Sequence, residues 1–318
     1  MKKMLAIAGL AFIVASCNPN YEKTPSGLTY KIIKGDNKQK LKFGDIVKIN
    51  GSIKITPKDT FLFSTTHLPE YLPVDTSSKQ THDFNEVLKL CSVGDSLIVV
   101  AQVDTLVKRG MAQYNEMFKK GDQIVTALRI QKAFSNQADQ AKDQQMEMEK
   151  ERVRQVAEVE NYLKKKGIKA EKTQNGVFVE VLSPGSAEKI TPGKEVTVNY
   201  TGAIMETGKV FDSNTDSTFH HLEPLKFVVG AGRTIRGWEE GMQLLGNGGK
   251  GNIYIPSLLG YGPPGSPPAI PPYSNLKFAV EVKNVVMAPP PPPMQGMPGG
   301  MQGQGQQDPR QQQQSGGN

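Results

Sequence analysis

The chain contains 318 residues, of which 37% are hydrophobic and 22% charged, and its formal net charge is +7. This positive excess is modest and scattered, so it gives no reason to propose a nucleic-acid partner and only a weak one to propose an anionic lipid surface. The chain has two cysteines, of which Cys17 is assigned to an anchor below, so the mature chain has no intramolecular disulfide and must be held together by packing.

The N-terminal segment is typical of a signal peptide. Two lysines precede an apolar run, residues 4–14, that is too short to span a bilayer as a mature helix. The run ends in VASC, which resembles the bacterial lipobox, so removal of residues 1–16 would leave Cys17 as the lipidated start of a tether, residues 17–23. Each buried acyl CH₂ contributes about 0.8 kcal/mol, so several chains would hold the protein on a membrane. Asn18 favours the periplasm-facing outer membrane of a Gram-negative envelope; the alternative is a free cysteine after an ordinary signal sequence.

An internal repeat determines the predicted architecture. The stretch KTPSGLTYKII from Lys23 aligns with KTQNGVFVEVL from Lys172, and FGDIVKINGSI aligns with PGKEVTVNYTG, both at an offset of 149 residues. A third pair, FLFSTT and KVFDSN, aligns with one deletion. Each copy shows short alternating strands between Gly and Pro turns, interrupted by one short helix. The sequence therefore predicts an α+β protein with two small antiparallel domains, residues 24–135 and 169–287.

The segment between the copies, residues 136–168, has no proline and no glycine before Gly167. It is rich in Gln, Glu, Lys, Ala and Arg, which are good helix formers, so it predicts a helix of about 30 residues. A thin heptad-like seam runs along it: Met146, Val153, Val156 and Leu163. Two glutamates interrupt that seam, so we expect a spacer helix that rests on one domain rather than a coiled-coil dimer interface. The oligomeric state stays open.

The second copy contains, in order, VNYTG, KVFDSN, PLKFVVG, TIRGWEEGMQLL, IPSLLGYG, AIPP and LKFAVEV. In the fourth motif, Ile235, Trp238, Met242 and Leu245 recur at helical spacing, which by itself indicates a short helix with its only tryptophan in the core. Together the motifs resemble the FKBP-type peptidyl-prolyl cis-trans isomerases. The resemblance implies a strongly bent antiparallel sheet wrapped around this helix, with a pocket between them whose floor is the tryptophan.

The resemblance also implies which residues form the site. Those that carry catalysis are Tyr200, Asp212, Ile235, Trp238 and Tyr261. Those that form the substrate-binding walls are Phe211, Leu225, Thr234, Ala269, Ile270 and Phe278. The Tyr261 hydroxyl and the Ile235 backbone N–H are expected to bind substrate carbonyl groups, and Asp212, bonded to Tyr200, to shape the polar side.

Some positions depart from the family pattern. Thr234 stands where valine is common, and Leu225 where an aromatic ring is common. Ser266 and Ala269 replace a histidine and a larger aliphatic residue of some members. The loop of residues 212–227 is longer than in the shortest members and lacks their arginine partner for the aspartate. These departures leave the floor intact but leave substrate preference and the affinity for macrolide inhibitors open.

The apolar lining has a physical reason. Rotation about an X-Pro bond crosses a barrier of about 20 kcal/mol because it breaks amide resonance. A twisted amide is less polar than a planar one, so a dry aromatic pocket favours the twisted form. This chemistry needs no nucleophile, and we expect no metal and no cofactor. The stretch GNGGKGN lacks the residues of a phosphate loop, and His220 and His221 would face opposite sides of a strand, which disfavours a shared metal.

The first copy keeps the scaffold but not these pocket residues. At the repeat offset the tyrosine of VNYTG becomes Gly51, and the aspartate of VFDS is assigned to Ser64. The helix reads HDFNEVLKLC, without tryptophan, and nothing like YG…IPP follows it. Phe63 and Cys91 are predicted core residues. The first copy is thus predicted to be a degenerate FKBP-like domain kept for binding or spacing.

The predicted function is that of a membrane-anchored prolyl isomerase acting on proline-containing unfolded or exported polypeptides. The alternative is a non-enzymatic chaperone or assembly module that binds unfolded chains. Residues 288–318, a proline run followed by Gly and Gln, predict a disordered tail with a polyproline II spacer, or else a proline-rich ligand for a partner.

Overall fold

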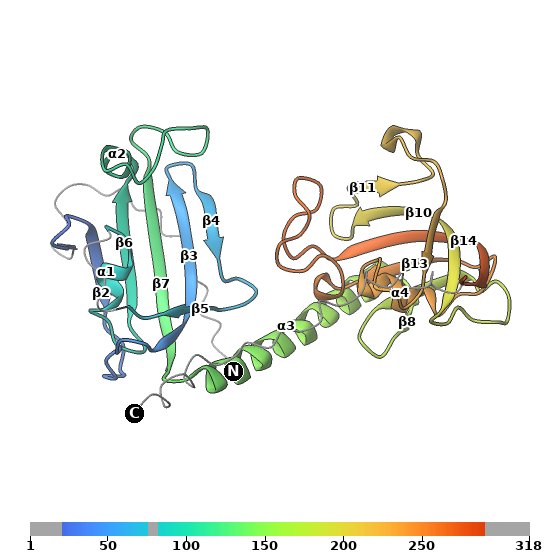
Figure 1. The fold of residues 1–318 in the computed structure, drawn as a ribbon, viewed down its shortest axis with the longest axis horizontal. Coiled ribbons are helices and arrows are strands. Elements are labelled where there is room, and N and C mark those ends of the chain that lie inside the picture. Colours follow the sequence, from blue (N-terminus) through green and yellow to red (C-terminus); the bar gives the residue numbers. More distant parts are fainter. Residues whose placement is uncertain (1–20, 76–81, 290–318) are drawn as a thin grey trace, which may run out of the picture.

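The computed structural model describes residues 21–75 and 82–289, which form two antiparallel sheets joined by one long helix (Figure 1). The predicted signal peptide, Cys17 and nearly all of the predicted tail lie outside the described residues. Within these described ranges, none of the helices combines the length and apolar character needed to cross a bilayer.

The first domain is a seven-stranded sheet in the order β1-β2-β6-β7-β3-β4, with β5 paired to β3. Its strands are β1 (Glu22–Lys23), β2 (Thr29–Ile33), β3 (Ile46–Thr56), β4 (Thr60–Ser64), β5 (Glu70–Pro73), β6 (Ser96–Gln102) and β7 (Gln123–Phe134). Two short helices accompany them, α1 (Asn85–Leu88) and α2 (Val103–Lys108). Because β1 pairs with β2, Glu22 and Lys23 belong to this sheet and not to the tether assigned from the sequence.

The second domain repeats this plan, in the order β8-β9-β13-β14-β10-β11 with β12 paired to β10. Its strands are β8 (Glu171–Lys172), β9 (Phe178–Ser183), β10 (Lys194–Ile204), β11 (Val210–Ser213), β12 (Leu225–Val228), β13 (Lys250–Ile255) and β14 (Leu276–Met287). It also contains helix α4 (Arg236–Met242) and two 3-10 turns, η1 (Ser217–Phe219) and η2 (Ser257–Leu259).

The two sheets agree even in their irregularities. Strand β3 has a bulge between Lys48 and Ile49, and its counterpart β10 has one between Thr197 and Val198, at the same offset as the sequence repeat. A second bulge recurs where β4 and β11 pair with these strands. A bulge bends its strand and locally increases twist, so its recurrence gives both sheets the same curvature. The predicted α+β architecture of two sheets with one topology and a long connecting helix is confirmed.

The pairing corrects one detail of the alignment. Asp212 lies opposite Gly202 in the second domain, and in the first domain Phe63 lies opposite Ile53, the residue equivalent to Gly202. The counterpart of Asp212 is therefore Phe63, not Ser64. The strand ladder sets this register: both strand pairs carry the same bulge, so the offset of 149 residues continues through β4 and β11, and the deletion assigned from the sequence is wrong.

Each domain has its own hydrophobic core. In the second domain, Trp238, Met242 and Leu245 are at most 4% exposed, as the predicted stripe requires. In the first domain, α1 contributes Val87, and Cys91 is fully buried near it. Burial raises the pKa of the Cys91 thiol to about 12, so the group stays protonated and acts as a small apolar residue, as predicted.

The connecting helix α3 runs from Gln137 to Lys166 and has 30 residues, as predicted. The side chain of Asn136 caps its start by accepting a hydrogen bond from the Asp139 N–H at 2.9 Å. Gly167 ends it in the left-handed conformation, with φ of 68°.

The two halves of α3 contact the domains in different ways. In its first half, the Asp143 carboxylate accepts hydrogen bonds from Lys48 and from the Tyr71 hydroxyl of the first domain, both at 2.7 Å. Its second half is buried in an apolar cluster with the second domain: Val156, Val159, Leu163, Phe178, Met205 and Tyr254. The helix therefore rests on both domains, and not on one as expected.

Only half of the predicted seam is used in these contacts. Val156 and Leu163 are buried, whereas Met146 and Val153 are 53% and 54% exposed. The reason is that the second domain covers only the C-terminal half of the helix, while the first domain meets the N-terminal half through charged side chains.

Candidate active site

Helix α4 lies directly on the sheet of the second domain. It begins after Ile235, whose extended backbone (φ −63°, ψ 143°) leads the chain into the helix. A Cβ at Gly237 would lie 2.3 Å from Cγ2 of Ile255, and one at Gly241 would lie 2.5 Å from Cγ2 of Ile253. Glycine in a helix interior costs about 1 kcal/mol relative to alanine, so these two glycines indicate that the close approach to β13 matters. The approach buries the tryptophan that follows the first glycine.

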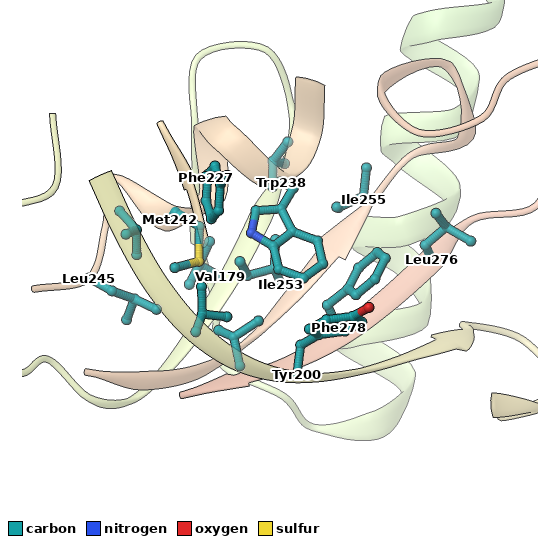
Figure 2. Packing of buried hydrophobic residues seen from close by; sticks show 14 of the residues in the cluster. Val179, Tyr200, Phe227, Trp238, Met242, Leu245, Ile253, Ile255, Leu276 and Phe278 are labelled. Atoms are coloured by element: carbon teal, nitrogen blue, oxygen red, sulfur yellow. The ribbon is translucent and has the colours of Figure 1, made fainter. Parts of the chain in front are cut away.

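The ring of Trp238 is the centre of an aromatic cluster (Figure 2). Its centroid lies 4.5 Å from that of Phe278, 5.1 Å from that of Tyr200 and 6.3 Å from that of Phe227. Phe211 extends the cluster by an edge-to-face contact with Phe278, with centroids 5.6 Å apart. These rings come from β10, β11, β12, α4 and β14, so the bent sheet and the helix together form one aromatic surface.

The indole N–H of Trp238 is buried and has no hydrogen-bond partner among the described residues. Buried tryptophans usually pair this group, because an unpaired donor costs about 1–3 kcal/mol. Packing alone does not explain this unpaired donor, which marks Trp238 as a candidate functional residue.

Gly202 makes room for two of these rings. A Cβ at this position would lie 2.6 Å from Cε1 of Phe278 and 2.8 Å from Cζ of Phe211. Any side chain on this part of β10 would therefore displace the wall of the cluster. The glycine of VNYTG is thus a determinant of the site.

The polar side of the site is centred on Asp212. Its Oδ2 accepts a hydrogen bond from the Tyr200 hydroxyl at 2.6 Å, which confirms the predicted pair. Its Oδ1 lies 2.7 Å from Nε2 of His221, a residue that the sequence reasoning considered only as a metal ligand. His220 adopts the left-handed conformation (φ 59°) at the end of η1, which turns the chain so that the next side chain meets the carboxylate. His221 is thus the basic partner of this aspartate, for which the sequence offered no arginine.

Two tyrosine hydroxyls remain protonated beside this carboxylate. Burial raises the pKa of Tyr200, and the hydrogen bond to Asp212 raises it further. Burial and the charge of Asp212 also raise the pKa of Tyr261. Both groups are therefore neutral at physiological pH. Tyr261 is 38% exposed at the rim, so its O–H is placed to donate to a ligand.

The segment between β13 and β14, residues 256–275, is called here the pocket loop. Ser266 and Ile270 exchange two backbone hydrogen bonds, at 2.8 and 2.9 Å, and the Tyr273 N–H donates to the Gly262 carbonyl at 3.0 Å. These bonds fold the loop back on itself, so that Ile270 is 3% exposed and packs against the aromatic cluster with Ala269.

Most of the predicted site residues come together. Eight of them belong to one apolar cluster with its packed neighbours: Tyr200, Phe211, Leu225, Ile235, Trp238, Ala269, Ile270 and Phe278. Asp212 and Tyr261 form the polar side. Thr234 is half-buried, and its hydroxyl donates to Oε1 of Glu239 at 3.3 Å. Within the described parts of the chain, no group of three or more His, Cys, Asp or Glu side chains is placed to hold a metal ion.

Comparison with known proteins places this site in a family. The family model for FKBP-type peptidyl-prolyl cis-trans isomerase matches residues 186–283, all within the second domain. The FK506-binding protein of Neisseria meningitidis serogroup B is 41% identical over 110 residues, which cover 35% of this chain and 96% of that protein. The peptidyl-prolyl cis-trans isomerase FPR2 of Saccharomyces cerevisiae is 42% identical over 100 residues, 31% of this chain and 71% of that protein.

A solved structure is also similar. The crystal structure of FkpA from Escherichia coli has 34% sequence identity and a TM-score of 0.36, covering 48% of this chain and 70% of that chain.

Proposed function

The chain belongs to the family of FKBP-type peptidyl-prolyl cis-trans isomerases and is an enzyme of that class, and from this premise we propose that its second domain isomerises X-Pro bonds in the aromatic pocket around Trp238. The observation that carries this proposal is the packing of Trp238 and Phe278 beside the Asp212 carboxylate. An apolar floor with one polar side matches a proline ring that is followed by a polar peptide.

The proposed mechanism is non-covalent. The proline ring packs on the aromatic floor, where water cannot stabilise the planar amide, so the less polar twisted amide is bound better than the planar one. The Tyr261 hydroxyl donates to one substrate carbonyl group. The N–H of Ile235 lies before the first turn of α4, where backbone donors have no partner within the helix, and it is assigned to a second carbonyl.

The substrates proposed for this pocket are proline-containing segments of unfolded or exported polypeptides. A relative bears the name FK506-binding protein, and we propose that this pocket also binds macrolides of that kind. Half-buried Leu225 and Thr234 line it in place of an aromatic ring and a valine, so they are the positions that adjust ligand preference.

Membrane attachment is a separate part of the proposal. Lipidation of Cys17 would fix the chain to the outer membrane, facing the periplasm, where exported proteins fold. The Cys17→Ser variant should be released into the soluble fraction when cells are broken. If this variant is found in the membrane fraction as the wild-type protein is, the proposed anchor is refuted. The proposed chemistry would be unaffected.

The catalytic proposal is tested with a protease-coupled assay on a short Ala-Leu-Pro-Phe peptide. We expect the mature chain to accelerate isomerisation, and Tyr261→Phe to lower kcat/KM about two- to tenfold, the effect of one hydrogen bond. The matched control is Tyr114→Phe, because Tyr114 is 49% exposed on the first domain. A folded mature chain without activity would refute the proposal, and an unfolded Tyr261→Phe variant would show that this hydroxyl is structural.

A holding function is the second candidate, and the surface of the first domain favours it. Several large apolar side chains of that domain are at least half exposed: Phe43, Phe61, Met111 and Met117. Such residues can bind unfolded chains without catalysis. The whole protein should then suppress aggregation of an unfolded test protein better than the second domain alone, and equal suppression would contradict this role.

A further inference from the structure

The two domains contact each other through an aromatic pair. His67 lies in the loop between β4 and β5 of the first domain, and Tyr273 lies in the pocket loop of the second. Their rings are stacked, with centroids 3.9 Å apart and an interplanar angle of 7°. Figure 1 shows both loops on the facing sides of the two domains, above helix α3.

The stacked histidine is fixed from below by helix α3. Nδ1 of His67 lies 2.9 Å from Oε1 of Glu151, and Arg154 donates to the same oxygen at 2.6 Å. The Glu151 side chain is only 3% exposed. Burial opposes its ionisation, but hydrogen bonds from Arg154, Gln155 and His67 outweigh burial and hold the pKa of this carboxyl below its ordinary value. The carboxylate is therefore charged, and Oε1 of Glu151 and Nη2 of Arg154 both contact Nδ1 of His67 and together orient the imidazole ring.

The same network reaches the other end of the pocket loop. Gln155, which is 1% exposed, donates to Oε1 of Glu151 at 2.7 Å through its amide nitrogen. Its amide oxygen accepts a hydrogen bond from the backbone N–H of Leu258 at 2.9 Å. Leu258 lies three residues before Tyr261 in the chain. The pocket loop is thus held near its beginning by Gln155 and near its end by His67.

Tyr273, the residue that His67 contacts, is connected to the residues of the site. The N–H of Tyr273 is bonded to the carbonyl group of Gly262, the residue next to Tyr261. Ile270, a wall of the pocket, precedes Tyr273 by three residues. A displacement of Tyr273 would therefore be passed to both Tyr261 and Ile270 through one backbone hydrogen bond and a short turn.

From this arrangement we propose that His67 of the first domain and Gln155 of α3 are positioning residues for the pocket of the second domain. The inference rests on the proposed function of that pocket. Surface loops are mobile unless contacts hold them in place. If the pocket loop takes its binding conformation only part of the time, the apparent affinity for the substrate falls in proportion to that fraction. The first domain therefore contributes to catalysis by keeping the pocket loop ordered.

The test compares variants of the full chain. His67→Ala removes the stacked ring, and we expect faster amide hydrogen exchange across residues 258–275 and a kcat/KM about two- to tenfold lower, mostly through a higher KM. His67→Phe keeps a ring on Tyr273 and should restore most of both properties. Gln155→Leu should mainly accelerate exchange at Leu258. The matched control is Ile33→Ala, since Ile33 is 49% exposed on the first domain.

The outcomes separate this inference from the proposed function. A His67→Ala variant with unchanged exchange in the pocket loop and unchanged KM would overturn the inference, because the contact would then be passive. If the wild-type protein is folded but inactive, the proposed function is refuted. The hydrogen-exchange measurement would still decide whether the first domain orders the pocket loop. If kcat/KM falls equally in His67→Phe and His67→Ala, the stacked rings are not the contact that positions the loop.

Discussion

The second domain has a tyrosine at position 200 where the first has a glycine, and this difference shows how one backbone plan can hold or exclude a cluster of aromatic side chains. Gly51, the counterpart, has φ of 153°, and a Cβ there would lie 1.9 Å from the carbonyl oxygen of Ala127. The first domain therefore has no room for a side chain at this point. Its Ile53 occupies the position of Gly202, which in the second domain leaves space for two phenylalanine rings.

The interiors of the two domains also differ in charge. Among the described residues, the buried Asp, Glu, Lys and His side chains lie in the first domain and in α3: Asp45, Lys48, His82, Glu86, Asp95, Asp122 and Glu151. The buried polar residues of the second domain are uncharged: Ser213, Asn214, Ser257 and Asn275. Isolated buried charges are costly, so the first domain depends on paired charges, whereas the second depends on aromatic packing.

The largest expected effect comes from separating the domains. A fragment of residues 136–287, which keeps α3 and its apolar cluster with the second domain, should isomerise the test peptide, since every assigned pocket residue lies in it. A folded fragment of residues 21–135 should show only the uncatalysed rate. Circular dichroism checks folding and the protease-coupled assay checks activity. Isomerisation by the first fragment would mean that the residues named here are not required.

The next effect concerns the backbone at Gly51. Gly51→Tyr should not create a pocket but should destabilise the first domain on the order of 3 kcal/mol, because the side chain meets the Ala127 carbonyl group and the φ value is strained. Denaturant titration measures the change, and Ser52→Tyr, at the next residue of the strand, is the control. A stable Gly51→Tyr variant would show that side chains alone distinguish the domains.

Acid should loosen one end of α3 before the other. Hydrogen bonds from Lys48, Tyr71 and Lys132 outweigh the burial of Asp143 and lower the pKa of this carboxyl from 3.8 to about 2. A carboxyl with a depressed pKa stabilises the folded state above its ordinary pKa, so a contribution of about 2 kcal/mol should be lost as the pH falls from about 4 to 2. The apolar contact with the second domain has no such dependence.

Small-angle scattering against pH should therefore show the first domain separating from the helix. Asp143→Asn should weaken this contact already at neutral pH and reduce its dependence on pH to the part contributed by Glu147, which also pairs with Lys48 at 3.0 Å, and by Glu151. A transition that is the same in both proteins would assign acid sensitivity to other carboxylates.

The smallest expected effect concerns the polar side of the pocket. His221→Ala leaves Asp212 bonded to Tyr200 alone, and because both His221 and Asp212 are partly exposed, kcat/KM should fall only about two- to fivefold. His221→Gln, whose amide nitrogen can donate from a similar place, should be closer to the unchanged protein. Equal rates for all three would remove His221 from the site.

Much of this structure follows from local sequence. The repeat predicted two sheets of one topology, the absence of Pro and Gly predicted α3, and Gly167 marked its end. The features that sequence did not predict depend on tertiary contacts. His221 meets Asp212 only because His220 takes the left-handed conformation, and the Asp212 counterpart became clear only from the strand ladder.

The position of α3 was also beyond sequence reasoning. A hydrophobic seam indicates where apolar surface is buried, but the contact with the first domain is made by charged side chains such as Asp143, which any solvated helix could carry. The stacked pair of His67 and Tyr273 joins residues that are far apart in the chain, and no local pattern records it.

The single tryptophan gives the molecule an optical reporter confined to one domain. Because Trp238 is the only indole in the chain and packs beside Tyr200 and Phe278, its fluorescence responds to the second domain alone. Far-ultraviolet dichroism, in contrast, responds to both sheets and the helix. Recording the two signals on one sample therefore separates the melting of the catalytic domain from that of its neighbour without labels, and ligand binding at the floor can be titrated by the change in emission.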